Sequence, residues 1–175
     1  MAEIFPDFAQ NGKAGMMVFH LLTHQAGMSG NLLPEGVAPL DVGNMDLIFE
    51  KIIANKPIFE TGTGASYSPY FGYLVLGKML EQTDPKGRSF AQIAQDELFA
   101  PLNMQSSSFG NMADNPKRVL ASHTDKMKQA DSTLQNAQAV ENLVNSMANH
   151  GWQVPAGNAF GTIDDVFLRL RKICV

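Results

Sequence analysis

The chain has only one cysteine in its 175 residues, Cys174, close to the C-terminus. A single cysteine excludes an intrachain disulfide and a metal cage built from thiolates. The chain also lacks an apolar run of the roughly 18–20 residues that a membrane-spanning helix needs, so no span is expected. The N-terminal residues do not follow the basic-then-apolar layout of a signal peptide. The sequence therefore leaves the cellular compartment unassigned.

Positive charge is scarce as well. Lys and Arg together number 13 against 17 Asp and Glu, which gives a formal net charge of -4. The basic residues are scattered rather than clustered, so a nucleic-acid partner is not expected. The hydrophobic share of 45% and the charged share of 17% are those of ordinary globular proteins. A chain of this length can bury its own core, and residues 1–175 are expected to form a single domain.

Alternating apolar and polar residues, the pattern of half-buried strands, are rare, and the helical period dominates. The sequence therefore predicts a mainly α domain with few or no strands. Asn44 is suited to cap a helix that Pro57 ends, and Ser89 to start a helix that Pro101 ends. The remaining helical patterns lie at 18–27, 71–82 and 134–147 and after Thr162.

Two of these helices carry specific expectations about their faces. The run 71–82 is apolar nearly all round, which predicts a central and well-buried helix. In the helix after Ser89, four side chains should face inward: Phe90, Ile93, Ala94 and Leu98.

The last expected helix begins with a capping box in which Asp165 replaces the usual Glu or Gln three residues after Thr162. Its inward residues should be Ile163, Val166, Phe167 and Leu170. The acidic pair Asp164 and Asp165 is explained by the preference of a helix N-terminus for negative charge. The pair therefore does not indicate a catalytic site.

Four segments carry motifs in a fixed order: Val18–Gly27 with His20-Leu-Leu-Thr-His24, Phe59–Gly77, Ser89–Met104, and Pro155–Asp165. In this order they resemble the serine β-lactamase-like hydrolases, a family that includes class C β-lactamases, D-alanyl-D-alanine carboxypeptidases and related esterases. The resemblance runs from about Phe5 to Arg171. It implies the α-rich part of the α+β β-lactamase/transpeptidase-like fold.

The resemblance also nominates site residues. Members of the family carry a Tyr-x-Asn box, which places the catalytic tyrosine at Tyr67 and substrate-binding positions at Ser68 and Pro69. Proline stands where the family has asparagine, so the side-chain amide is missing. The family acts by acyl transfer to serine, hydrolysing esters, amides or β-lactams, which implies a small-molecule acyl substrate and no cofactor.

The family's nucleophile lies in a Ser-x-x-Lys motif, and no such motif occurs in these 175 residues. The later Lys-Thr-Gly motif is also absent. The resemblance therefore implies a partial hydrolase that is inactive as an isolated chain, and the sequence alone leaves enzymatic activity undecided. The alternative is a non-catalytic helical module that binds a partner or itself. An uncovered apolar surface, expected from the run 71–82, motivates self-association.

Tyr67 has an ordinary structural interpretation beside the catalytic one. It is that of a tyrosine packed in a loop, with its hydroxyl bonded to the backbone. A phenol with a pKa near 10 is a poor base at neutral pH unless another group assists it. Ser68 is expected to point to the opposite face of the extended segment, which disfavours a Tyr67–Ser68 pair.

His20 and His24 are spaced as in His-Glu-x-x-His zinc sites, on one face of a helix. The glutamate is missing because Leu21 follows His20, and the sequence nominates no third ligand. No metal site is expected. In the resembling family this segment is structural, with one histidine bonding the backbone near the site.

Overall fold

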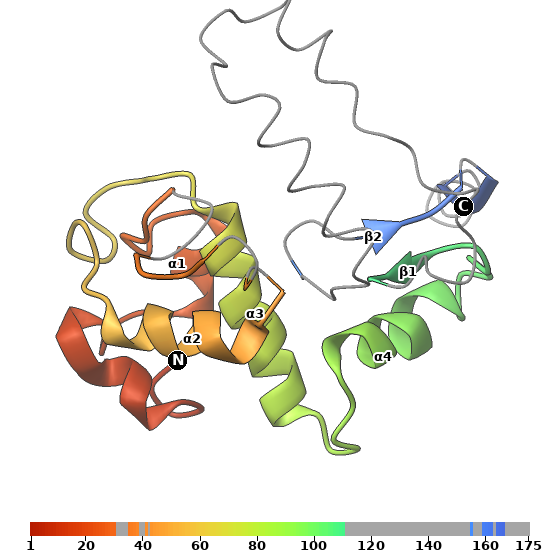
Figure 1. Cartoon of the computed structure of the whole chain (residues 1–175), viewed down its shortest axis with the longest axis horizontal. Helices are drawn as coiled ribbons and strands as arrows, with labels where there is room; N and C mark the ends of the chain where they lie inside the picture. Colours follow the sequence, from red (N-terminus) through yellow and green to blue (C-terminus); the bar gives the residue numbers. More distant parts are fainter. Residues whose placement is uncertain are drawn as a thin grey trace, which may run out of the picture.

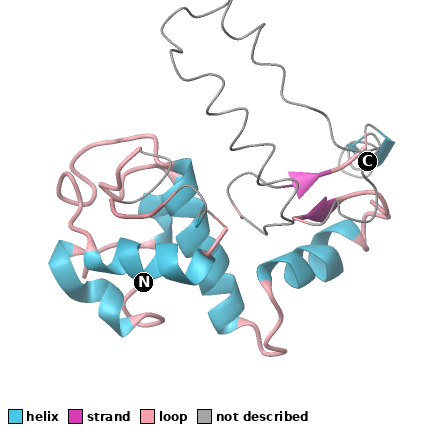
Figure 2. Cartoon of the chain, in the orientation of Figure 1, coloured by secondary structure: helices cyan, strands magenta, loops and turns pink. Residues whose placement is uncertain are grey.

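The computed structural model describes residues 1–30, 35–38, 41, 43–110, 155, 159–162 and 164–166 of the chain. Helices are the main regular structure of this part, and two short strands pair beside them (Figures 1 and 2). The predicted mainly α fold with few strands is confirmed. In chain order the elements are η1 (Pro6–Gly12), α1 (Val18–Leu22), α2 (Met45–Ala54), α3 (Pro69–Thr83), α4 (Phe90–Ala94), η3 (Gln95–Phe99), β1 (Ser108–Phe109) and β2 (Ala159–Phe160).

The main core lies where α3 packs against α1 and α2, and η1 also packs against α2. The buried residues come from all four elements and from the segments just before and just after α1. They are Phe8, Met16, Leu21, Ala26, Met28, Ile48, Ile52, Tyr70, Phe71, Leu74 and Val75. Two of the four segments that carry the family resemblance, around His24 and around Tyr67, border this core.

The expected helix after Asn44 is confirmed by its caps. The Asn44 side chain accepts a hydrogen bond from Leu47 N at 3.1 Å, which satisfies one of the free amides of the first turn. At the other end, three carbonyls of α2 and its C-cap accept bonds from side chains near the N-terminus. Asn11 Nδ2 donates to Ala54 O at 2.8 Å, and Lys13 Nζ donates to Ile53 O at 2.8 Å and Asn55 O at 2.6 Å. No local sequence pattern indicated this second cap, because its donors lie some forty residues away along the chain.

Helix α3 extends slightly beyond the predicted run 71–82, because it begins at Pro69 and ends at Thr83. The predicted central, well-buried position holds for only part of its surface. Leu74 and Val75 are fully buried, but Tyr73 and Leu80, seven residues apart on one face, are exposed. Helices α1, α2 and α4 pack against other faces of α3 and leave this strip open.

Helix α4 begins as predicted, with Ser89 and Gln92 in a reciprocal capping box. The inward position predicted for Leu98 is wrong: Leu98 is 40% exposed and Phe99 is only 6% exposed. The reason is that α4 continues as the π-helix η3, whose wider turn delays the inward position by one residue. Phe99 packs in a second, smaller core with Ala94 and Met104.

Hydrogen bonds and ion pairs of Asp84 and Arg88 stabilise the turn from α3 to α4. Asp84 accepts backbone bonds from Lys86 and Arg88, and its carboxylate also pairs with the Arg88 guanidinium at 2.7 Å. Arg88 Nη1 also pairs with Asp96 at 3.0 Å and Glu97 at 2.9 Å on η3. The hydrogen bonds from Arg88 lower the pKa of Asp84 to about 2.

Strands β1 and β2 pair antiparallel, with Ser108 opposite Phe160. The start of the last expected helix follows, where Asp165 N donates to Thr162 Oγ1 at 3.3 Å. Only this half of the predicted capping box forms. The Asp165 carboxylate is buried and instead accepts bonds from Ser106 N at 2.9 Å and Ser107 Oγ at 2.7 Å.

Asp165 thus joins the small sheet to the following helix, a role that the helix-dipole explanation missed. Val166, predicted to face inward, is exposed. No helix in the described part of the chain is long and apolar enough to cross a membrane. The predicted helix 134–147 and the residues Cys174, Ile163, Phe167 and Leu170 lie outside the described residues.

Candidate functional site

Two of the four segments that carry the family resemblance, Val18–Gly27 and the start of Phe59–Gly77, lie side by side. Ser66 N donates to His24 O at 2.9 Å, and Gly62 N donates to Gln25 O at 2.9 Å. Ile58 N donates to Gly27 O at 2.7 Å, so backbone bonds join the end of the His20–Gly27 segment to the loop before α3. These backbone bonds alone set the register between two segments that lie more than thirty residues apart in the sequence. The loop that carries Tyr67 is therefore anchored along its length.

Gly27 is required at this junction. Its φ of +72° lies in the left-handed region, and a Cβ built on it would lie 2.3 Å from Phe59 O. Only glycine accepts both the backbone angle and the close approach. The missing side chain of Gly27 is what lets the 57–59 segment approach so closely.

His24 fixes the orientation of the loop end. Its φ is +58°, which turns the chain out of α1 and aims the ring at the loop. Ser68 N donates to His24 Nδ1 at 3.4 Å, and the imidazole ring meets the Tyr67 ring edge-to-face with centroids 4.8 Å apart. An accepting Nδ1 requires the neutral ring with its proton on Nε2. One side chain therefore contacts both the backbone and the aromatic ring of the Tyr67–Ser68 pair.

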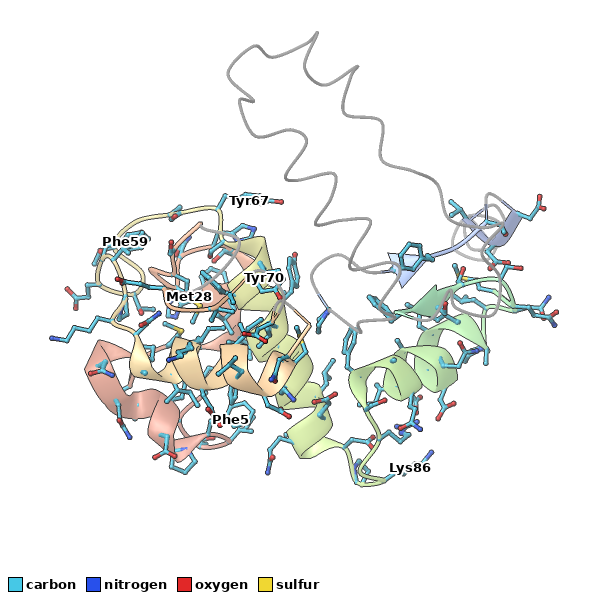
Figure 3. The ribbon with its side chains drawn as sticks, viewed as in Figure 1. Phe5, Met28, Phe59, Tyr67, Tyr70 and Lys86 are labelled. Atoms are coloured by element: carbon cyan, nitrogen blue, oxygen red, sulfur yellow. The ribbon has the colours of Figure 1, made fainter. Side chains whose placement is uncertain are left out.

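Tyr67 itself is 73% exposed, and its phenol projects outward from the loop (Figure 3). No hydrogen bond between its hydroxyl and another described residue is formed. The structural interpretation, in which the ring is packed and the hydroxyl is bonded to the backbone, does not describe this geometry. The exposed hydroxyl is free to meet a group brought to this face.

Ser68 has the opposite environment, with an exposed fraction of 3%. The contrast with Tyr67 fits the expected alternation of an extended segment and places the two side chains on opposite faces. Pro69 is the first residue of α3, a position that proline favours because its missing amide has no partner there. The side chain of Pro69 lies outside the described residues.

The structure separates His20 from His24. Helix α1 ends at Leu22, before His24, so the two imidazoles do not share one helix face. His20 Nδ1 accepts a bond from Met17 N at 3.1 Å and caps the start of α1. Both histidines thus bond the backbone, a role the resemblance had implied for one of them. Within the described ranges, no three His, Cys, Asp or Glu side chains gather as a metal site.

Tyr70, one residue into α3, contrasts with Tyr67. It is buried in the main core, and burial raises the pKa of its phenol. Tyr73 is exposed, and its ring lies 6.4 Å from the His24 ring. The exposed aromatic groups around His24 are therefore Tyr67 and Tyr73, whereas Tyr70 is structural.

Comparison with known proteins decides the family. The Beta-lactamase family model matches residues 1–168. The chain belongs to the Beta-lactamase family. The esterase/beta-lactamase LipL of Mycobacterium tuberculosis (strain ATCC 25618 / H37Rv) is 32% identical over 120 residues, which are 68% of this chain and 27% of that protein.

Two solved structures share the fold. A family VIII carboxylesterase superposes with a TM-score of 0.71 and 26% identity, covering 92% of this chain and 44% of its own. A penicillin-binding protein homolog from Caulobacter crescentus superposes with a TM-score of 0.68 and 20% identity, covering 95% and 45%. The chain thus spans less than half the length of these similar proteins.

Proposed function

We propose that this chain is the tyrosine-bearing part of a serine hydrolase that acts on small ester, amide or β-lactam substrates by acyl transfer. Membership of the Beta-lactamase family supports the reaction class. The names of the similar proteins, an esterase/beta-lactamase and a carboxylesterase, support ester and β-lactam substrates. One observation carries the site: an exposed Tyr67 phenol on a loop that His24 and the backbone hold in place.

In this proposal Tyr67 exchanges a proton with the serine nucleophile during attack. A lone phenol is a weak base near pH 7, so it needs a cation close by to lower its pKa. The family takes both nucleophile and cation from Ser-x-x-Lys, and that motif does not occur in this sequence. We therefore propose that the 175 residues alone do not turn over substrate. Catalysis would require a serine and a lysine supplied by further polypeptide.

Ser68 and Pro69 are proposed to adjoin the bound substrate. Ser68 would contribute through the loop geometry that it fixes, because its side chain is buried. Pro69 would shape the start of α3 without offering the hydrogen bond that an asparagine gives. The loss of one such bond to a substrate oxygen typically weakens binding or transition-state stabilisation by about 1–3 kcal/mol.

A hydrolysis assay tests this proposal. The purified chain is mixed with a p-nitrophenyl ester and with a chromogenic cephalosporin, beside the Tyr67→Phe and Tyr73→Phe variants. We expect the chain to show no hydrolysis that depends on Tyr67, which means no activity that is lost in Tyr67→Phe and retained in Tyr73→Phe. Turnover with that pattern would mean that these residues carry their own nucleophile, which would contradict the requirement for further polypeptide.

A second candidate is a non-catalytic module that self-associates. The observation in its favour is an apolar surface at α1, where Met17, Phe19 and Leu22 are all more than half exposed. Helix α3, which first motivated the idea, offers only Tyr73 and Leu80. Sedimentation should then show an oligomer that Phe19→Glu dissociates and Leu80→Glu leaves intact. A parent chain that stays monomeric at the highest concentration would contradict it.

A further inference from the structure

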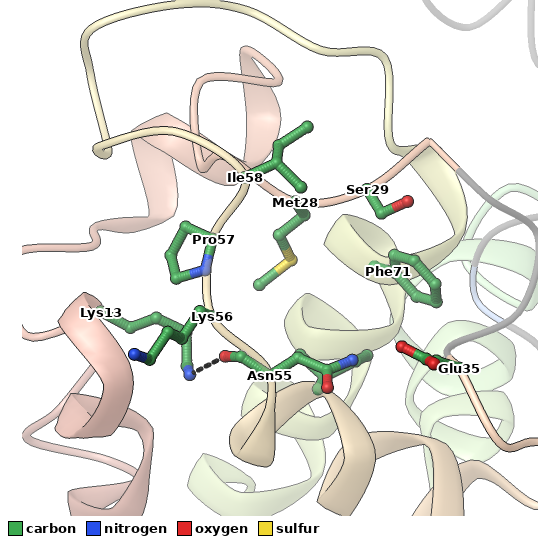
Figure 4. Close-up of a pocket in the computed structure, with 10 residues that line it drawn as sticks. Lys13, Met28, Ser29, Glu35, Asn55, Lys56, Pro57, Ile58 and Phe71 are labelled. Atoms are coloured by element: carbon green, nitrogen blue, oxygen red, sulfur yellow. Dashed lines mark hydrogen bonds between the residues drawn. The ribbon is translucent and has the colours of Figure 1, made fainter.

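A pocket of about 350 Å³ lies near the C-terminal end of α2, beside the first turn of α3 (Figure 4). Its apolar wall consists of three buried side chains from different parts of the main core, Met28, Ile52 and Phe71. The exposed Ile58 lies at its rim. Neither Tyr67 nor His24 is among the described residues that line it. The pocket is therefore separate from the candidate site.

Lys13 gives this pocket an unusual charge. Its side chain is only 2% exposed, and its ammonium donates two bonds, to Ile53 O and Asn55 O. No described carboxylate lies within ion-pair distance of it. Carbonyl dipoles satisfy two of its three donors but do not neutralise a full positive charge. Burial lowers the pKa of Lys13, as expected for a cation without a counter-ion.

The other charges of the pocket are arranged by sign. Lys56, which is exposed, lies at the same end as Lys13, and Glu35 lies at the opposite end (Figure 4). The apolar side chain of Met28 lies between the two ends. An anionic group would be attracted to the lysine end and repelled by Glu35. An apolar body would then lie along the middle of the pocket.

We propose that this pocket binds a small apolar carboxylate, with its carboxylate at Lys13 and Lys56 and its hydrocarbon part against Met28, Ile52 and Phe71. The volume lies at the small end of the range for ligand sites, which fits a monocarboxylate of modest chain length. The proposal does not depend on hydrolase activity, because the lining residues are distinct from the Tyr67 loop. Its failure would leave the proposed function untouched.

Octanoate is a suitable probe, with octanamide as its uncharged counterpart. Titration of the ¹⁵N-labelled chain, followed by NMR, should give saturable shifts at Met28, Ile52 and Phe71 amides with octanoate. Octanamide should bind at least about fivefold more weakly, because it lacks the charge that meets the lysines. Equal binding of the two probes, or no saturable shift at these residues, would overturn the proposal.

Charge variants locate the anion. Lys56→Glu should weaken octanoate binding about fivefold, whereas Lys86→Glu, the same change on the exposed α3–α4 turn, should leave it within about twofold. Lys13→Met should abolish binding in a chain whose circular dichroism is unchanged. If Lys13→Met does not fold, Ile58→Asp at the exposed rim replaces it and should also weaken binding. Identical affinities for Lys56→Glu and Lys86→Glu would overturn the placement.

Discussion

His24 shows how one residue combines several local constraints. Its left-handed backbone ends the α1 turn, its Nδ1 accepts the Ser68 amide, and its ring packs on Tyr67. The sequence pattern indicated a histidine near the site through the family resemblance. It gave no indication of which histidine contacts Tyr67, because that depends on the turn after Leu22.

Two substitutions separate the roles of His24. Asparagine tolerates the left-handed backbone and places an oxygen where Nδ1 lies, whereas phenylalanine keeps the ring contact with Tyr67 but loses the acceptor. We expect His24→Phe to be less stable than His24→Asn by about 1 kcal/mol, because the Ser68 amide loses its partner. Urea unfolding of both variants measures the difference. Equal stabilities would contradict the expectation that the loss of the Ser68–His24 bond outweighs the ring contact that phenylalanine keeps.

Gly27 allows a second test at the residue scale. Gly27→Ala adds a Cβ that meets Phe59 O in addition to the left-handed strain, and we expect a loss of about 2–4 kcal/mol. Gly87 has a φ of +64° but nothing within 4 Å of an added Cβ, so Gly87→Ala should cost only about 1 kcal/mol. Denaturation midpoints measure both losses. Similar losses at the two positions would show that the approach of Phe59 relaxes freely.

At the scale of elements, the sequence predicted the starts of α2 and α4 well, because capping depends on local residues such as Asn44 and Ser89. It failed where burial depends on distant neighbours. The π-helix η3 buries Phe99 in the position expected for Leu98. The packing around α3 leaves Tyr73 and Leu80 exposed. For the candidate site, the resemblance indicated the position of Tyr67, but its exposure follows only from the paired loops.

The α3–α4 turn predicts a pH dependence. The pKa of Asp84 is lowered to about 2 from an ordinary value near 4, so the carboxylate binds fewer protons in the folded than in the unfolded state. Its contribution to stability is therefore complete above about pH 4 and disappears as the pH falls through about 2.

Asp84→Asn tests this assignment. Urea unfolding between pH 6 and pH 2 should show the parent chain losing its advantage over Asp84→Asn as the solution is acidified. The matched control is Asp46→Asn, which removes an exposed carboxylate that pairs with Lys78 at 2.6 Å. A constant difference between the parent and Asp84→Asn across this range would contradict the assignment, since the variant has no carboxylate to titrate.

At the scale of the whole molecule, we propose that residues 1–175 form one domain although the described part has two core clusters. The connection runs through α3 and α4: Lys78 pairs with Glu81, whose other oxygen accepts Phe90 N at 2.8 Å. Pro155 also packs directly on Gly77, and a Cβ built on Gly77 would lie 2.4 Å from the Pro155 ring. Calorimetry should therefore record one cooperative transition. Two separated transitions would show that the clusters unfold independently.

We propose that this chain carries the catalytic tyrosine of a serine hydrolase but not the serine nucleophile. Intact-mass spectrometry can test this proposal, after incubation of the folded chain with a penicillin and, separately, with a fluorophosphonate. We expect no stoichiometric adduct with either reagent. One adduct per chain on a single serine, lost when that serine is replaced by alanine, would show that these 175 residues contain a complete nucleophilic site and would contradict the claim.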